Sequence, residues 1–208
     1  VIGHSMGEIA AAYVASALSL QDAVTVICRR SQLLNQVSGQ GAMAVVELPY
    51  AEAETALIGY EDRLAIAVSN SPRSTVLSGD TATLELVVAQ LQSTGVFARF
   101  VKVNVASHSP QMDPLRADLL TALADLQPQP PLVPLYSTSQ TEGQPQYDAD
   151  YWVRNLRNPV LFMDGIKRLL ADKHTIFIEM SPHPILLPMI EDCCQQWTEA
   201  GLVLSDLG

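Results

Sequence analysis

A serine flanked by glycines stands at the start of the chain, in Gly3-His4-Ser5-Met6-Gly7, and an alanine-rich stretch follows it directly. The spacing G-x-S-x-G before a helix is typical of a nucleophile elbow, a sharp strand-to-helix turn that lifts the serine hydroxyl above a sheet. The N-terminal amides of such a helix point at the serine and can stabilise negative charge on an acyl oxygen. The pattern predicts a nucleophilic Ser5; a surface Gly-Ser-Gly turn is the alternative.

Arg30 is the second residue whose position suggests chemistry. It lies on a helix that is expected to begin after Ser19 and to run to about Val37, in the middle of the stripe of apolar side chains. An unpaired buried guanidinium is very costly, so Arg30 must face an anionic or strongly accepting group. Two interpretations stay open: a pairing with a protein carboxylate or carbonyls, or a two-pronged clamp for a substrate carboxylate.

A nucleophilic serine needs a base, and the chain has four histidines. His4 adjoins Ser5, but successive side chains at a sharp turn point apart, which favours a packing or hydrogen-bonding role. His174 lies in a charged turn and is expected to be solvated. His108 and His183 each follow a predicted strand, and the spacing does not choose between them.

Composition limits the classes of function. A chain of 208 residues can bury one core, or one core with a smaller satellite domain. Hydrophobic residues make up 48% and charged residues 16%, which is typical of a globular protein. The net charge of −10 argues against nucleic acid and against an anionic membrane surface as the main partner.

The cysteines and the chain start add further expectations. Three cysteines form neither a disulfide framework nor a metal-ligand spacing, so we expect no metal and a cytoplasmic setting. The sequence shows no signal peptide and no apolar run of membrane-spanning length. An elbow needs a buried strand in front of it, and only Val1 and Ile2 precede Gly3. We therefore expect sheet-forming sequence upstream, so that the N-terminal part of the core is missing from these residues.

The middle of the chain has the pattern of a small unit of alternating strands and helices. Turn residues separate its segments, and Asp80 is placed to cap a helix. The predicted order is strand, helix, strand, strand, helix, strand, over 42–47, 50–58, 64–68, 74–78, 81–91 and 97–105. This is the order of a ferredoxin-like unit, so we expect residues 41–103 to form an inserted ferredoxin-like subdomain.

The flanking residues, 1–40 and 104–208, predict a larger α/β body around that insertion. Beyond the two N-terminal helices, the expected helices cover 115–126, 151–156, 160–170 and 184–197, and the expected strands cover 133–137 and 175–180. A polar loop is expected over 138–150. The predicted fold class is therefore α/β.

Taken together, these motifs resemble the acyltransferase domains of modular polyketide synthases, which are similar to the malonyl-carrier-protein transacylases. The resemblance covers essentially the whole chain. Besides the serine motif it rests on Arg29-Arg30-Ser31-Gln32, Gly41-Ala42-Met43, Ser78-Gly79-Asp80, the segments 105–110 (VASHSP) and 151–160 (YWVRNLRNPV), and Glu179 to Pro184.

The resemblance implies an α/β-hydrolase-like core with an inserted ferredoxin-like subdomain, in agreement with the order of elements. It also implies roles for residues: Ser5 as the nucleophile, His108 as general base and acid, and Arg30 as the clamp for the carboxylate of an extender unit. The backbone carbonyl of Asn155 would orient the histidine in place of an acid. The amide of Met6 would supply one oxyanion donor, and a loop upstream of the elbow would supply the second.

The implied reaction is ping-pong transfer of a carboxylated acyl unit from acyl-coenzyme A, through an acyl-serine, to the phosphopantetheine thiol of an acyl carrier protein. The domain would bind no cofactor, and a ketosynthase and other domains would neighbour it in the same polypeptide. The small Ser107 before His108 is similar to the motif of methylmalonyl-selecting members, whereas malonyl-selecting members carry a bulkier aromatic residue there. Met6 is usual in neither class. The resemblance favours methylmalonyl over malonyl.

Two other functions stay open. A serine esterase or thioesterase on the same core would need an acidic third triad member late in the chain and would have no use for a buried Arg30. An inactive structural domain would not need Ser5, His108 and Arg30 to be present.

A carrier protein is expected to be acidic, as this chain is, so docking would need a local basic patch. The candidates from the sequence are Arg154, Arg157, Lys167 and Arg168.

Overall fold

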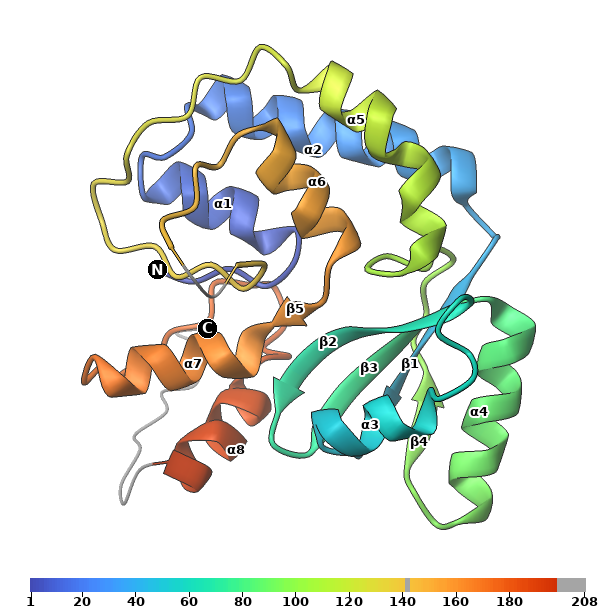
Figure 1. Ribbon diagram of the computed structural model, residues 1–208. Helices are drawn as coiled ribbons and strands as arrows, with labels where there is room; N and C mark the ends of the chain where they lie inside the picture. Colours follow the sequence, from blue (N-terminus) through green and yellow to red (C-terminus); the bar gives the residue numbers. More distant parts are fainter. Residues whose placement is uncertain (141–142, 198–208) are drawn as a thin grey trace.

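One main part of the molecule is a helical region that brings together the start of the chain and its third quarter (Figure 1). The computed structural model describes residues 1–140 and 143–197. The apolar faces of four helices share one core there, which includes Ile9, Val26 and Trp152. These helices are α1 (Gly7–Val14), α2 (Leu20–Leu34), α5 (Arg116–Ala122) and α6 (Ala149–Arg157), with the 3-10 turns η1 (Asn35–Val37) and η2 (Pro110–Leu115).

Side-chain caps fix where two of these helices begin. The hydroxyl of Ser19 accepts from the amide of Asp22 at 3.0 Å, and the carboxylate of Asp148 accepts from the amide of Tyr151 at 2.9 Å. The first amides of a helix have no partner within the helix, so these contacts stabilise the first turns of α2 and α6. The predicted helix start at Ser19 is confirmed.

A five-stranded sheet forms the other main part of the molecule, with strand order β4-β1-β3-β2-β5. The strands are β1 (Ala42–Val46), β2 (Leu64–Ser71), β3 (Ser74–Gly79), β4 (Ala98–Phe100) and β5 (Val160–Leu161). All pairings are antiparallel except β2 with β5, which is parallel with Val68 opposite Val160. With α3 (Tyr50–Ala56) and α4 (Thr81–Ser93) between them, β1 to β4 follow the predicted strand–helix–strand–strand–helix–strand order.

Different helices cover the two faces of this sheet. Neighbouring residues of a strand point to opposite faces, and Leu77 packs with α3 and α4 while Val76 packs on the other side. That other side is covered by α7 (Phe162–Ala171) and α8 (Leu187–Trp197). The backbone amides of residues 185–187, at the start of α8, donate to the carboxylate of Glu179 at 3.0 to 3.1 Å.

Two predicted strands are wrong as strands. Residues 133–137 contribute only an isolated parallel bridge between Ile2 and Tyr136, and residues 175–180 pair with no strand among those that the structure describes. The second segment still alternates as an extended chain does, with Phe177 and Glu179 buried and Ile176 and Ile178 exposed. A strand is defined by a hydrogen-bonded neighbour, and an apolar pattern alone does not supply one.

Two further boundaries differ from the sequence prediction. β4 ends at Phe100, well before the predicted end at residue 105, and the predicted helix over 160–170 begins with the short strand β5. Because β5 joins the sheet from outside residues 41–103, the sheet is larger than the predicted insertion. The division of the chain into 1–40 with 104–208 and 41–103 stays a prediction, and its residues 141–142 and 198–208 lie outside the described residues.

Candidate active site

Ser5 occupies a strained turn immediately before α1. Its φ is +52°, a left-handed conformation that a residue with a Cβ seldom adopts. The turn also needs Gly3, since a Cβ there would come within 2.3 Å of the backbone of Glu8. A Cβ on Gly7 would meet no atom within 4 Å, so of the two glycines that flank Ser5 only Gly3 is required by a close approach.

His108 is the histidine that contacts Ser5. Its Nε2 lies 2.7 Å from the serine Oγ, and its Nδ1 lies 2.8 Å from the backbone carbonyl oxygen of Asn158. The expected carbonyl was that of Asn155, and this assignment is wrong. Asn155 lies inside α6, whereas Asn158 is the residue that ends the helix, where a carbonyl is left without a helical donor.

The C-terminus of α6 holds His108 by two contacts. The backbone amide of His108 donates to the carbonyl of Leu156 at 3.0 Å, in addition to the contact between its ring and Asn158. His108 itself has a φ of +63° and is 2% exposed. The position of the imidazole is therefore set by a helix end 50 residues further along the chain.

Burial lowers the pKa of His108 to about 3, and the positive charge of Arg30 adds to this effect. The carbonyl of Asn158 opposes the shift because it stabilises the protonated ring. The ring is therefore neutral at physiological pH. With Nδ1–H donating to Asn158, the lone pair is on Nε2 and faces the serine hydroxyl.

Arg30 points toward the same serine from α2. One guanidinium nitrogen donates to the side-chain oxygen of Asn155 at 2.6 Å, and the other lies 3.4 Å from the Oγ of Ser5. Arg30 is 4% exposed, and its Nε has no hydrogen-bond partner in the described part of the chain. Burial lowers its pKa to about 10, with a smaller opposing effect of Glu8, so the side chain stays charged.

No carboxylate lies within ion-pair distance of Arg30 among the described residues. The internal ion pair that the sequence left open is therefore not observed there. Its partners are a neutral amide and a hydroxyl, which can accept from the guanidinium but cannot cancel its charge. A buried cation of this kind has capacity for a further anionic partner.

Glu8 is a buried polar residue that the sequence analysis missed. It is 1% exposed, and its carboxylate accepts hydrogen bonds from Ser139 and Tyr151 at 2.9 Å and from Asn155 at 2.5 Å, besides the amide of Thr138. Asn155 thus bridges the carboxylate of Glu8 and the guanidinium of Arg30. One signal in the sequence could have found it, since Glu8 lies on the same face of α1 as the buried Ala11 and Ala12.

The remaining predicted residues lie as follows. Met6 is the N-cap residue of α1 and is 48% exposed, and Ser107 is half-buried immediately before His108. Nε2–H of His4 donates to the side-chain oxygen of Asn70 at 2.9 Å, and the ring packs edge-on against Phe162, which is a packing and hydrogen-bonding role. His183 is exposed, and in the described structure its side chain does not join Ser5.

The described residues contain neither a metal-ligand cluster nor a helix that could span a membrane. They contain no group of three or more His, Cys, Asp or Glu side chains arranged to hold a metal ion. None of their helices combines the length and the apolar character needed to cross a membrane.

A serine in an elbow, against a histidine and beside a buried arginine, is an arrangement suited to acyl transfer through a covalent serine ester. The sequence comparison agrees with this class. The model of the acyl transferase domain family matches residues 1–204. The chain belongs to this family.

Its relatives are polyketide synthases. The chain is 48% identical over 195 residues to a mycocerosic acid synthase-like polyketide synthase of Mycolicibacterium smegmatis. This match covers 92% of this chain and 9% of the relative. Among solved structures it is similar to the acyltransferase domain of the polyketide synthase PpsC of Mycobacterium tuberculosis, with a TM-score of 0.93, 38% identity, and coverage of 99% of this chain and 64% of that one.

A second solved structure is similar at the same level. The acyltransferase domain from module 8 of the salinomycin polyketide synthase has a TM-score of 0.96 and 40% identity, and the match covers 100% of this chain and 49% of that one. The chain thus spans about a tenth of the length of the curated relatives it matches. These neighbours confirm the α/β fold class and the resemblance to polyketide synthase acyltransferases.

Proposed function

We propose that this chain transfers a carboxylated acyl unit from acyl-coenzyme A to the phosphopantetheine thiol of an acyl carrier protein, through an ester on Ser5. The observation that carries the proposal is the convergence of His108 and Arg30 on one hydroxyl, at 2.7 and 3.4 Å from its oxygen. The first can activate the hydroxyl, and the second can select what the hydroxyl attacks.

In the first half-reaction the Oγ of Ser5 attacks the thioester carbon while its proton passes to Nε2 of His108. A bond forms between Oγ and the acyl carbon, the carbon–sulfur bond breaks, and the histidine returns the proton to the departing thiolate of coenzyme A. The amide of Met6, the N-cap residue of α1, directly follows the serine in the chain and would donate to the oxyanion.

In the second half-reaction the same groups work in reverse order. His108 takes the proton from the incoming phosphopantetheine thiol, the sulfur attacks the serine ester, and the proton returns to Oγ as the ester breaks. The carrier leaves with the acyl unit, and the serine is restored. The two half-reactions balance with the acyl thioester as donor, the carrier thiol as acceptor and the thiol of coenzyme A as the product released.

Arg30 gives the selectivity for a free carboxylate. Its guanidinium is held by Asn155 and faces Ser5, so a carboxylate on the acyl group can accept two hydrogen bonds from it once the substrate enters. Because the charge of Arg30 helps to depress the pKa of His108, a bound carboxylate would also raise that pKa and strengthen the base. A donor without a carboxylate would lack both effects.

We favour methylmalonyl over malonyl as the transferred unit. The support is the small side chain of Ser107, which directly precedes His108 at the position where the resemblance gives malonyl-selecting members a bulky aromatic residue. A single methyl group changes discrimination by only about 1–3 kcal/mol in an apolar pocket, so a mixture of donors is the right test.

The test is the intact mass of the full-length domain, with the upstream sequence expected above, after exposure to an equimolar mixture of malonyl-, methylmalonyl- and acetyl-coenzyme A. We expect a methylmalonyl adduct that is absent in Ser5→Ala and lost in Arg30→Ala. An acetyl adduct in equal amount would contradict the role of Arg30.

The same experiment addresses the esterase and the inactive domain. An esterase would release free acid rapidly whatever residue stands at position 30, and an inactive domain would form no adduct. The esterase is disfavoured by the carbonyl of Asn158 at the position where a triad would place an acid.

A further inference from the structure

Glu8 is a buried carboxylate in the first turn of α1, and no step of the proposed reaction uses it. It is 1% exposed, and within the described part of the chain its carboxylate accepts four hydrogen bonds. An acidic residue near the start of a helix is favourable to the helix dipole, but that effect does not require burial. Because burying a charge is costly, the place of Glu8 among these donors needs a further explanation.

The partners of Glu8 come from two other parts of the chain. Tyr151 and Asn155 lie about one turn apart on the same face of α6, and both donate to the carboxylate, at 2.9 and 2.5 Å. The segment 138–139 adds one backbone amide and one hydroxyl. Asn155 differs from the other donors in its second contact, since its side-chain oxygen accepts from Arg30 at 2.6 Å.

The amide of Asn155 has one orientation that satisfies both of its charged neighbours. An ionised carboxylate only accepts hydrogen bonds and a guanidinium only donates them, so the NH2 group must face Glu8 and the oxygen must face Arg30. The NH2 group also lies 3.0 Å from the Oγ of Ser139 and 3.3 Å from the carbonyl oxygen of Ser5. Without the charge of Glu8, only these two longer contacts would oppose rotation of the amide.

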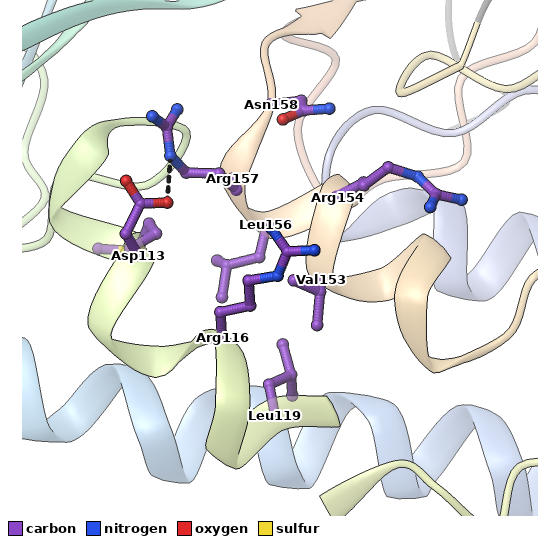
Figure 2. Close-up of a pocket in the computed structure, with 9 residues that line it drawn as sticks. Asp113, Arg116, Leu119, Val153, Arg154, Leu156, Arg157 and Asn158 are labelled. Atoms are coloured by element: carbon purple, nitrogen blue, oxygen red, sulfur yellow. Dashed lines mark hydrogen bonds and ion pairs between the residues drawn. The ribbon is translucent and has the colours of Figure 1, made fainter. Parts of the chain in front are cut away.

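The solvent-facing side of α6 is held by contacts that do not involve Glu8. Figure 2 shows this side, where the side chain of Arg157 donates to the carboxylate of Asp113 on η2 at 2.8 Å. Apolar side chains of α6 and α5 pack in one core next to this ion pair. Since the helix is anchored in this way, the contribution of Glu8 is the orientation of the Asn155 amide rather than the placement of α6.

The same amide separates two opposite charges. A direct ion pair would occupy the guanidinium of Arg30 and compensate its charge within the fold. With the amide between them, Glu8 stabilises the cation from a distance, and its charge opposes the lowering of the pKa of Arg30 by burial. The other terminal nitrogen of Arg30 lies 3.4 Å from the Oγ of Ser5, the atom that would carry the acyl group.

We propose that Glu8 is a positioning residue for donor selection: through the amide of Asn155 it orients the guanidinium of Arg30 and leaves it available for the carboxylate of the incoming acyl unit. The inference rests on the proposed function, in which Arg30 selects carboxylated donors. Loss of the Glu8 charge should therefore change which donor is used. A residue that only stabilised the fold would affect all donors equally.

The experiment uses the full-length domain and measures ester formation on Ser5 with methylmalonyl- and acetyl-coenzyme A over a range of donor concentrations, per folded molecule. The variant is Glu8→Gln, which keeps the size of the side chain and removes its charge. The matched control is Glu179→Gln. Glu179 is also buried, and its carboxylate accepts four described hydrogen bonds from residues 181–187, but it lies outside the bridge to Arg30.

We expect Glu8→Gln to reduce the preference for the methylmalonyl over the acetyl donor about tenfold, equivalent to about 1.4 kcal/mol, through a higher KM for the methylmalonyl donor. The rate with the acetyl donor should change little. Glu179→Gln should keep the wild-type preference even where its melting temperature falls by as much. An equal loss of rate with both donors in Glu8→Gln would assign Glu8 to the fold alone and overturn the proposal.

A second variant keeps the proposal testable if Glu8→Gln does not fold. The double variant Glu8→Gln/Asn155→Asp retains one buried negative charge with an amide beside it, but moves the carboxylate next to Arg30. We expect this protein to fold and to lose the preference for carboxylated donors, because an internal ion pair would then occupy the guanidinium. A double variant with the wild-type preference would also overturn the proposal.

Failure of the proposed function would be recognised separately. If the wild-type domain forms no ester on Ser5, the proposed function fails. Titration of the Ser5→Ala variant with methylmalonyl- and acetyl-coenzyme A still tests the role of Glu8, because it measures binding without ester formation. The addition of Glu8→Gln should reduce the ratio of the two Kd values, and an unchanged ratio would refute the role of Glu8.

Discussion

The sheet formed by β1 to β4 and the helical region that carries Ser5 are built from contacts of different range. In the sheet, β2 and β3 are joined by a tight turn with Ser71 opposite Ser74. In the helical region the decisive contacts join residues 103 to 147 positions apart, such as Ser5 with His108 and Glu8 with Asn155. Within β1 to β4 the longest pairing, Ala44 with Phe100, joins residues 56 positions apart, so the first region depends on shorter-range contacts than the second.

The two regions also differ in what they bury. The core between the sheet and α3 and α4 consists of apolar side chains such as Leu77 and Leu84. The helical region buries the charged side chains of Glu8 and Arg30 together with Asn155. Buried charge costs stability unless every partner is in place, so the part of the molecule suited to chemistry is also the part most sensitive to the loss of one atom.

The sharpest test of this contrast is Asn155→Ala. It removes the acceptor of Arg30 at 2.6 Å and a donor to Glu8 at 2.5 Å, and leaves both charges buried. We expect the free energy of unfolding to fall by about 3–5 kcal/mol and the preference for carboxylated over acetyl donors to decrease. Denaturant titration and donor competition measure the two effects.

The matched control is Asn158→Ala, three residues along the same chain. It keeps the backbone carbonyl that holds His108, so both measured quantities should change little. A similar loss in both variants would mean that the side chain of Asn155 has no special role.

In the sheet region we expect Leu84→Ala to lower stability without changing chemistry. Leu84 is fully buried between α4 and the sheet, and a cavity there should cost about 3 kcal/mol. Leu86→Ala, two residues on and 65% exposed, should cost less than about 0.5 kcal/mol. In both variants the rate of ester formation per folded molecule, measured below the melting transition, should equal that of the wild type. A slower rate in Leu84→Ala would show that the sheet region and the helical region are not independent.

The smallest expected effect concerns pH. The pKa of His108 is lowered from about 6.5 to about 3 in the folded chain, so between these values the unfolded chain binds a proton that the folded chain does not. Stability therefore decreases as pH falls through this window. From pH 6.5 to 5.5 the contribution of His108 is about 1 kcal/mol.

The measurement is the difference in unfolding free energy between wild type and His108→Gln at several pH values. The decrease should be smaller in the variant, since one of the two histidines with a lowered pKa is gone and His4 remains. Parallel curves would show that burial does not depress this pKa.

The sequence could predict features that depend on local rules. The elbow, the caps at Ser19 and Asp80, and the order of elements over 42–100 all follow from spacing, turn residues and side-chain periodicity. They are present in the structure because each is decided within a few residues.

The failures share a physical cause, which is that the deciding partner lies far away in sequence. Residues 175–180 have the alternation of a strand, but alternation does not provide a neighbour to pair with. The resemblance implied the carbonyl of Asn155, and which carbonyl reaches His108 depends on where α6 ends in the folded chain, with Asn158 as its C-cap. The sequence could predict that Arg30 faces a hydrogen-bond acceptor, but it could not identify that acceptor. A side-chain amide 125 positions away can accept from a buried guanidinium as a carboxylate can.

The support of the imidazole by a peptide oxygen has a consequence for tolerance to acid. A carboxylate in that place would become protonated in moderately acidic solution. It would then no longer hold the proton on Nδ1, and the ring could adopt its other tautomer. A main-chain oxygen does not take up a proton in this range, and substitution of the Asn158 side chain does not remove the oxygen. The orientation of the ring is thus insulated both from the medium and from most substitutions, and is lost only when the end of the helix itself unwinds.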